Sequence, residues 1–334
     1  MGNYDLILAG DIGATKTNLA LFERASFPKK ALRELKYKNR EFGGITDIVS
    51  SFLSKGREKP TLACFGVAGP IRDNRVRMTN LDWLIDGRQL ARELTMEEIV
   101  LVNDLVATAK GAPLLGEDEL FQINGGKKDP KGNMAVIAPG TGLGKAFLVR
   151  RNKHLLPVAS EGGHVDFAPR NRQQLALLDF LWQREEHVSV EKVCSGIGLV
   201  NIHDFFTSSL DAEDPAVTST APDERTPIIV QTALTALQAG NSSHISLRTV
   251  ALFWEILAAE AANLALDVLA TGGIYIGGGL CPRMLSVCVK DRFMDIFVRG
   301  VYREMLSDIP VYIILNPKTA LLGAAACGLE LKRQ

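Results

Sequence analysis

The chain lacks the cysteine pattern of a zinc protein or of a disulfide-stapled domain. Its five cysteines are scattered, without the paired short spacings that a zinc site requires. Their odd number also argues against a complete disulfide framework. We therefore expect no resident metal, and reduced, mostly buried thiols at Cys64, Cys194, Cys281, Cys288 and Cys327.

Excess charge and long uninterrupted apolar runs are also missing. The formal net charge is +0, whereas proteins that bind nucleic acid or anionic membranes carry a basic surface. Acidic residues interrupt the longest apolar helical stretch, 250–269, and the N-terminus has no signal-peptide pattern. Leu6 stands where a myristoylation motif needs Ser or Thr. We expect a cytoplasmic protein with neither a nucleic-acid nor a membrane partner.

The chain has enough apolar residues for more than one core. It contains 334 residues, of which 46% are hydrophobic. Single cores stop growing at about 250–300 residues. Two domains with a cleft between them are therefore expected.

One strand-turn-strand motif occurs twice in the sequence. An apolar strand enters a turn rich in Gly and Thr and returns as a second strand. The first Gly/Thr turn (residues 10–15) joins strands 6–9 and 19–22, and the second (residues 140–144) joins strands 135–138 and 146–149. Both could be ordinary β-hairpins. Because glycine lets the backbone approach phosphate oxygens and threonine adds a donor, the repeat predicts a duplicated nucleotide-binding protein.

The turns do not match other nucleotide motifs. A Walker loop ending at Gly144-Lys145 would need glycine at Pro139 and Ser or Thr at Ala146, and the spacing of Gly140, Gly142 and Gly144 is not the dinucleotide fingerprint. A P-loop enzyme and a classical dehydrogenase are thus disfavoured. Asp11, at a strand end, could position a hydrated magnesium ion.

Coarse patterns predict the remaining elements. Helices are expected at about 46–54, from Asp86 to about 97, at 253–270 and at 320–329, the last starting with small residues that favour close packing. Strands are expected at 61–68, 99–102 and 274–276. The segment 208–227 reads as a surface excursion. The turn 277–279 could hold adenine or simply link a strand to a helix.

Read together, these segments resemble bacterial-type glucokinases of the hexokinase/actin-like ATPase superfamily. The matches are 10–15, 66–70, Thr79-Asn80-Leu81, 101–104, 139–144, 160–164, Glu191, Ser195-Gly196 and 277–279. The resemblance implies a duplicated, two-lobed α/β fold of the actin-like ATPase (ribonuclease H-like) type with an interlobe cleft. It implies a smaller lobe over 1–113, a larger lobe over 114–316, and a C-terminal helix, 317–334, that returns to the first.

The same resemblance implies ATP-dependent phosphorylation of glucose to glucose 6-phosphate by a homodimer. Magnesium would be carried by ATP, close to Asp11. Asp104 would be the general base, since phosphoryl transfer needs chiefly an acceptor for the alcohol proton. The implied sugar ligands are Asn103, Asp104, Glu161, His164 and Glu191. The implied ATP-binding residues are Gly10, Asp11, Gly13, Thr15, Lys16, Gly140, Thr141, Gly142, Gly277, Gly278 and Gly279.

Each implied sugar residue also has a structural alternative. Asp104 could cap a helix that starts at Leu105. Glu161 and His164 could form a loop ion pair, or His164 could join Asp166 in a metal site. Glu191 could be a solvated residue at the start of a helix. The order and spacing of the motifs favour the functional interpretation.

The chain departs from the family in two places and leaves other functions open. Ala14 stands where a second glycine is usual and would be strained if its φ were positive. An arginine that is frequent in the family shortly after this turn is also absent. Any cationic contact from this turn to phosphate must therefore come from Lys16. The zinc motif of the repressor/ORF/kinase group is absent, which favours the zinc-free branch. The alternatives are a kinase with another hexose preference, a sugar-responsive regulator and a conformational ATPase. The regulator is disfavoured, because the nine residues before Gly10 are too few to form a helix-turn-helix.

Overall fold

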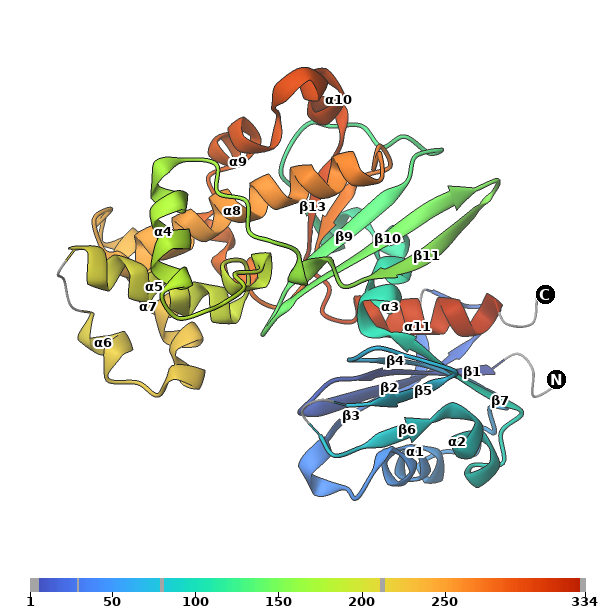
Figure 1. Ribbon diagram of the computed structural model, residues 1–334. Coiled ribbons are helices and arrows are strands. Elements are labelled where there is room, and N and C mark those ends of the chain that lie inside the picture. The colour runs from blue at the N-terminus through green and yellow to red at the C-terminus, as the bar shows by residue number, and fades with distance from the viewer. Residues whose placement is uncertain (1–5, 29, 79–80, 211–213, 331–334) are drawn as a thin grey trace. The chain divides into compact units, whose positions relative to one another are not determined.

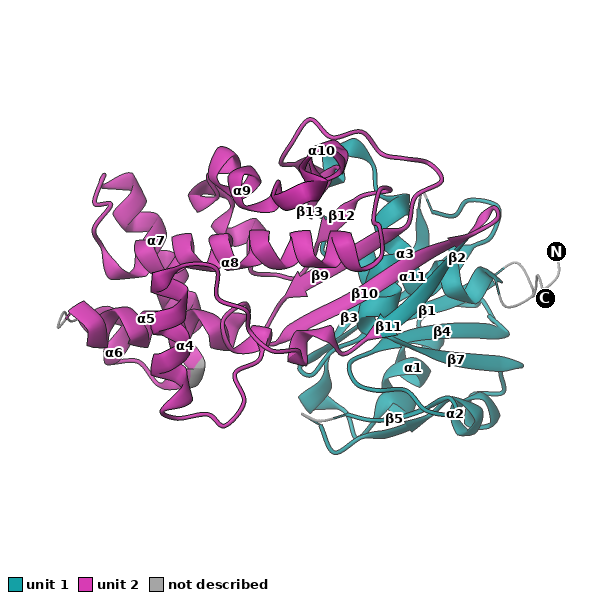
Figure 2. Cartoon of the chain, turned by 45° about the horizontal axis from the view of Figure 1, so that its top comes forward, with its two compact units in different colours: residues 1–119, 155–159, 316–334 teal, residues 120–154, 160–315 magenta. Residues whose placement is uncertain are grey.

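The structure is a computed structural model that describes residues 6–28, 30–78, 81–210 and 214–330. The chain divides into two compact units, shown in teal and magenta in Figure 2. Unit 1 comprises Met1–Glu119, Leu155–Ala159 and Asn316–Gln334, and unit 2 comprises Leu120–His154 and Ser160–Leu315. The matching dipeptide Thr79-Asn80 lies outside the described residues.

Unit 1 is built on a five-stranded sheet of order β3-β2-β1-β4-β7. The first predicted hairpin is confirmed, because β1 and β2 are antiparallel and Leu8 lies opposite Leu21. β1 is parallel to β4, and β4 is parallel to β7. The strands are β1 (Leu6–Ile12), β2 (Lys16–Glu23), β3 (Ala31–Lys38), β4 (Leu62–Val67) and β7 (Glu98–Asn103).

The placement of Gly10 and Asp11 in the first Gly/Thr turn is wrong. β1 continues to Ile12, so both residues are part of the strand and the turn is formed by residues 13–15. The reason lies in packing across the sheet: a Cβ at Gly10 would lie 2.6 Å from Cδ1 of Phe65. Gly10 therefore makes room for a core aromatic ring.

Successive side chains along each strand point to opposite faces of the sheet, and both faces of this sheet are apolar. Leu8 and Phe65 contribute to the face covered by α1 (Ile45–Ser54) and α2 (Gly87–Glu93). Ile7 and Cys64 contribute to the opposite face, which is covered by α3 (Asp104–Gly111) and α11 (Thr319–Glu330) (Figure 1). Asp86 caps α2 as expected, accepting the N–H groups of Arg88 and Gln89. α2 ends at Glu93, earlier than predicted.

Two glycines allow α3 and α11 to pack backbone to backbone. A Cβ at Gly323 would lie 1.7 Å from the carbonyl oxygen of Ala107, and one at Gly111 would lie 2.1 Å from that of Thr319. No side chain fits at either position without displacing a helix. The last helix of the chain is thereby joined closely to the helix that begins at Asp104.

A six-stranded sheet of order β11-β10-β9-β12-β13-β8 repeats the strand pattern of the first sheet, and all of it except Leu155–Ala159 of β11 belongs to unit 2. The second predicted hairpin is confirmed, since β9 and β10 are antiparallel, and β9, β12 and β13 are parallel. β8 adds an antiparallel edge. The strands are β8 (Leu120–Gln122), β9 (Met134–Pro139), β10 (Leu143–Arg151), β11 (His154–Ser160), β12 (Ile274–Ile276) and β13 (Val311–Ile314).

The core of unit 2 is dominated by one long helix, α8 (Ile245–Asp267), which starts earlier than predicted. By length and composition α8 is apolar enough to cross a membrane, but 78% of its most apolar window is buried inside the structure. It is therefore a core helix. The other helices of the unit are α4 (Arg172–Trp182), α5 (Gly196–Leu210), α6 (Pro215–Thr218), α7 (Arg225–Gln238), α9 (Lys290–Phe297) and α10 (Arg303–Asp308).

The described residues of the segment 208–227 are mostly exposed, as its polar composition predicts, but Asp214 and Val217 are buried. Val217 is fully buried, and the buried carboxylate of Asp214 accepts hydrogen bonds from Ser246 (2.7 Å) and contacts Nε2 of the buried His203 (3.2 Å). Polar groups can be buried when they are paired in this way. The segment is thus anchored to α5 and α8.

Short elements complete the chain. β5 (Arg75–Arg77) and β6 (Leu84–Asp86) form a small hairpin in unit 1. The 3-10 helices are η2 (Asn39–Glu41), η3 (Ala112–Leu114), η4 (Glu117–Glu119), η5 (Gly162–His164), η6 (Val190–Lys192), η7 (Pro222–Glu224), η8 (Cys281–Val287) and η9 (Gly300–Tyr302).

Candidate active site

In unit 1 the predicted ligands gather at the carboxyl ends of parallel strands. Asp11 is the penultimate residue of β1, and it pairs in register with Gly66 of β4. Asn103 ends β7 and pairs with Val67. In open α/β sheets ligands bind at this edge. The structure therefore brings the first Gly/Thr turn and the Asn103-Asp104 pair to one edge of one sheet.

Asn103, rather than Asp104, caps α3. Its Oδ1 accepts the N–H groups of Leu105 (2.9 Å) and Val106 (3.3 Å), and its Nδ2 donates to the carbonyl of Gly69 (3.2 Å). Asp104 is the first residue of the helix, and its Oδ1 also accepts the N–H of Leu105 (3.0 Å). The alternative in which Asp104 serves as the cap is wrong. The half-buried Asp104 carboxylate lies at the positive end of a helix, where negative charge is stabilised.

The first Gly/Thr turn is held by a residue that sequence reasoning missed. The buried Asn39 donates from Nδ2 to the carbonyl of Gly13 (2.8 Å), and its own N–H donates to the carbonyl of Thr15 (3.0 Å). Its Oδ1 accepts the hydroxyl hydrogen of Thr17 (2.8 Å). These bonds fix the turn and leave the side chains of Thr15 and Lys16 exposed.

Alanine at position 14 introduces no backbone strain. Among the described residues, Ala14 is absent from the non-glycine residues with positive φ, which are Asp73, Asn74, Thr95, Asn152 and Leu269. Gly13 also lacks a positive φ. The departure from the family's double glycine is therefore tolerated by this turn.

Asp11 has the chemistry to hold a hydrated magnesium ion. Burial raises the pKa of its carboxyl group, while a hydrogen bond from Asn18 (3.3 Å) and the charge of Lys36 lower it. A carboxylate oxygen is a hard ligand of the kind that Mg²⁺ prefers. Asp11 stands two residues before the turn, so its carboxylate is a candidate magnesium ligand beside the predicted phosphate turn.

In unit 2 the second Gly/Thr turn packs against the start of α5. The N–H of Gly140 donates to the carbonyl of Gly142 (2.8 Å), and the N–H of Gly196 donates to the carbonyl of Gly140 (2.8 Å). Thr141 is exposed. Helix N-termini and Gly-rich turns both favour anions. The turn and the first residues of α5 are thus a candidate phosphate site.

The predicted adenine turn lies directly beside the second Gly/Thr turn. Gly278 has φ +79°, and a Cβ there would lie 2.1 Å from the carbonyl oxygen of Pro139. The N–H of Gly277 donates to the carbonyl of Ile137 (2.8 Å). Gly279 is exposed, with open space where a Cβ would be. Two segments of the predicted ATP site, far apart in sequence, are therefore neighbours within unit 2.

Leu143 on β10 organises the predicted sugar residues of unit 2. Its N–H donates to Oε2 of Glu191 (2.8 Å), and a Cβ at Gly142 would lie 2.4 Å from that same oxygen. The carbonyl of Leu143 faces Gly163, where a Cβ would lie only 2.0 Å away. We name residues 160–164 the sugar loop. Glu191 and the sugar loop are both held against the first residues of β10.

The structural alternatives for these residues fail. Glu191 lies in η6 with its carboxylate bonded to Leu143, so it is not a solvated residue at a helix start. Asp166 pairs with His187 (2.8 Å) and not with His164. None of the ion pairs in the described parts of the chain joins Glu161 to His164. Both of these side chains are exposed and belong to the sugar loop.

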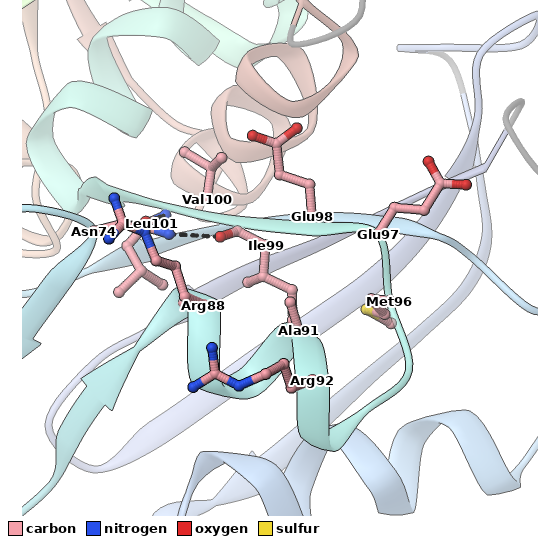
Figure 3. Close-up of a pocket in the computed structure, with 11 residues that line it drawn as sticks. Asn74, Arg88, Ala91, Arg92, Met96, Glu97, Glu98, Ile99, Val100 and Leu101 are labelled. Atoms are coloured by element: carbon pink, nitrogen blue, oxygen red, sulfur yellow. Dashed lines mark hydrogen bonds between the residues drawn. The ribbon is translucent and has the colours of Figure 1, made fainter.

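A cavity elsewhere in unit 1 contains no predicted site residue. It has a volume of about 660 Å³ and is lined by α2 and β7 (Figure 3). At this place Asn74 donates to the carbonyl of Ile99 (2.8 Å) and accepts the N–H of Leu101 (2.7 Å). Asn74 thereby closes part of the free edge of β7.

Comparisons with known proteins agree with the predicted family. A family model described as Glucokinase matches residues 8–331. The glucokinase of Nostoc punctiforme is 38% identical over 98% of this chain and 99% of its own. A glucokinase structure from an Antarctic psychrotroph has a TM-score of 0.85 and 30% identity, covering 97% of this chain and 99% of that one.

A more distant structure shows the same fold. It is a ROK family glucokinase from Streptomyces griseus in complex with glucose and AMPPNP, with a TM-score of 0.67, 21% identity, and coverage of 97% of this chain and 99% of that one. The duplicated actin-like ATPase fold predicted from the sequence is confirmed. The protein belongs to the glucokinase family.

Proposed function

We propose that the protein phosphorylates glucose at its primary hydroxyl with ATP, forming glucose 6-phosphate and ADP. The observation that carries the proposal is that glucokinase relatives match the chain over nearly its whole length. The local geometry supports it, because the predicted ligand groups gather within each unit: Asp11 and Asn103 lie at neighbouring strand ends in unit 1, and Glu191 and the sugar loop both contact Leu143 in unit 2. The full-length matches to glucokinases do not favour the alternative, a kinase with another hexose preference.

Asp104 is assigned as the general base. The oxygen of the sugar hydroxyl attacks the γ-phosphorus, its proton passes to the Asp104 carboxylate, and the bond from the γ-phosphorus to the bridging oxygen breaks to release ADP. Phosphoryl transfer of this kind depends mainly on positioning and charge stabilisation. The two Gly/Thr turns supply backbone N–H groups for phosphate oxygens, and the exposed Lys16 supplies a cation.

The proposed function is tested by an assay of ADP release coupled to NADH oxidation, across a panel of sugars and phosphate donors. Glucose with ATP should give the highest kcat/KM. A higher value for mannose or glucosamine would favour the alternative hexose kinase. ATP hydrolysis that no sugar stimulates would contradict both and favour a conformational ATPase.

Magnesium dependence is a second expected result. Magnesium, held with the nucleotide near Asp11, would neutralise charge on the transferring phosphoryl group. Activity should vanish with EDTA and return with added Mg²⁺. Elemental analysis of the purified protein should find no stoichiometric zinc. One zinc ion per chain would contradict the assignment to the zinc-free branch.

Glucose is expected to change the conformation of the protein more than nucleotide does. The proposed sugar ligands belong to both units, with Asn103 and Asp104 in unit 1 and Glu161, His164 and Glu191 in unit 2. A sugar that bonds to all five has a higher affinity for a closed state. Small-angle scattering should show a smaller radius of gyration with glucose than with an ATP analogue. An unchanged radius, together with ATP hydrolysis near the kinase rate in the absence of sugar, would contradict closure.

Cytoplasmic location and a homodimeric state complete the proposal. Burial of α8 inside unit 2 and the pairing of none of the five cysteines in a disulfide support an intracellular enzyme. Light scattering coupled to size-exclusion chromatography should give twice the 36.3 kDa chain mass. A single-chain mass at micromolar concentration would contradict the dimer.

A further inference from the structure

A buried ion pair lies directly beneath the sugar loop. Lys145 of β10 and Glu260 of α8 pair through Nζ and Oε1, and their side chains are only 4% and 10% exposed. Lys145 follows the second Gly/Thr turn, but its charge is buried in unit 2 by this pairing. Desolvation offsets most of the attraction in such a pair, so added stability alone is a weak account of it.

The pair contacts the sugar loop through the stem of Lys145. A Cβ at Gly162 would lie 3.0 Å from Cδ of Lys145 and 3.7 Å from its Nζ. Gly162 is flanked by Glu161 and, across Gly163, by His164, both proposed sugar ligands. Since Gly163 already rests on the carbonyl of Leu143, the loop is supported at two points, both on β10.

On its other side the pair is anchored by a chain of polar contacts. Nδ2 of Asn263 donates to Oε2 of Glu260 (3.0 Å), and Arg299 donates to Oδ1 of Asn263. Arg299 is itself fixed by the carbonyl of Ala259 (3.1 Å). Both oxygens of the Glu260 carboxylate are therefore engaged, which restricts the rotamers of Glu260 and, through it, of Lys145.

We propose that Lys145 and Glu260 are positioning residues for the sugar loop. The Lys145 side chain, held by Glu260, fixes the position of Gly162 relative to β10. It thereby determines where Glu161 and His164 contact the sugar. This inference rests on the proposed function, because it assigns a role within the same site. It concerns glucose recognition and not the phosphate turns.

The test replaces the pair by apolar side chains of similar size, Lys145→Met with Glu260→Leu. Removing both charges leaves neither one buried alone, so the urea midpoint should stay near the wild-type value. The KM for glucose should rise about tenfold, because small displacements of a ligand loop are costly. The KM for ATP should change little, and amide hydrogen exchange should become faster at residues 160–164.

Glu255→Gln is the matched control, since Glu255 lies on α8 like Glu260 and its ion pair is with Arg292 of α9, whose side chain is 56% exposed. Its glucose KM should equal that of the wild type. A stable double variant with wild-type glucose KM and wild-type exchange would show that the pair is merely structural. Should the double variant unfold, Glu260→Gln serves instead, and a wild-type glucose KM there would equally overturn the proposal.

The same design separates this inference from the proposed function. If the wild-type enzyme phosphorylates no sugar, the proposed function fails. Hydrogen exchange at 160–164 does not depend on turnover, so it still decides whether the pair orders the loop. Unchanged exchange in the double variant would reject the positioning role whatever the enzyme's activity.

Discussion

Replacing Asp104 by asparagine should lower kcat by at least roughly 10²-fold, the scale of general-base catalysis. An amide cannot take up the proton of the attacking hydroxyl, but it can still hydrogen-bond the sugar. The glucose Kd from isothermal titration should therefore stay within about tenfold of the wild-type value, a loss of no more than about 1.4 kcal/mol. Turnover is measured with saturating glucose and ATP, so that weaker binding does not enter the comparison.

The matched control is Asp82→Asn, a carboxylate in the same unit whose side chain is 98% exposed. Its kcat should equal that of the wild type. Because Asn103 and not Asp104 provides the main cap of α3, Asp104→Asn should lower the free energy of unfolding by no more than about 1 kcal/mol, the contribution of a charge at a helix N-terminus. Near-normal turnover in the folded variant would remove Asp104 from the role of base.

The largest effect on stability is expected at the contact between α3 and α11. Gly323→Ala places a methyl group 1.7 Å from the carbonyl oxygen of Ala107, so the two helices must separate. Because backbone atoms cannot move aside as a flexible side chain can, the free energy of unfolding should fall by about 3 kcal/mol or more. Urea denaturation followed by circular dichroism measures the change.

Gly125→Ala is the control for this substitution. A Cβ at Gly125 meets nothing within 4 Å, and its φ is not positive. Its effect should lie within about 0.5 kcal/mol, as for other surface substitutions. Equal unfolding midpoints for Gly323→Ala and Gly125→Ala would show that α11 does not depend on close backbone contact.

Local patterns predicted the hairpins and most strand positions well. Each Gly/Thr turn joins two apolar strands that are adjacent in the sequence, so local residues suffice to predict their pairing. β1 pairs with β2 and β9 pairs with β10 as expected. β12 has the predicted bounds, 274–276. Family resemblance supplied what local patterns could not: the fold and the order of the ligand groups.

The errors arose where distant residues decide the outcome. Gly10 stays in β1 because of Phe65, and the first turn is fixed by Asn39, 26 residues after Gly13. Nothing in the local sequence marks either contact. Within the mostly exposed segment 208–227, Asp214 is buried because it has partners on α5 and α8, and composition alone does not reveal such partners. The roles of the individual site residues remain predictions.

The α3–α11 contact also constrains how the chain folds as it is made. α3 ends at Gly111 and α11 begins at Thr319, with all of unit 2 between them. At about 5–20 residues per second, the ribosome takes on the order of 10 to 40 s to synthesise that interval. During this time Ile7, Ala20 and Cys64 have no α11 to cover them. Unit 1, although begun first, is completed last, and its uncovered apolar face is the surface that a nascent-chain chaperone would shield.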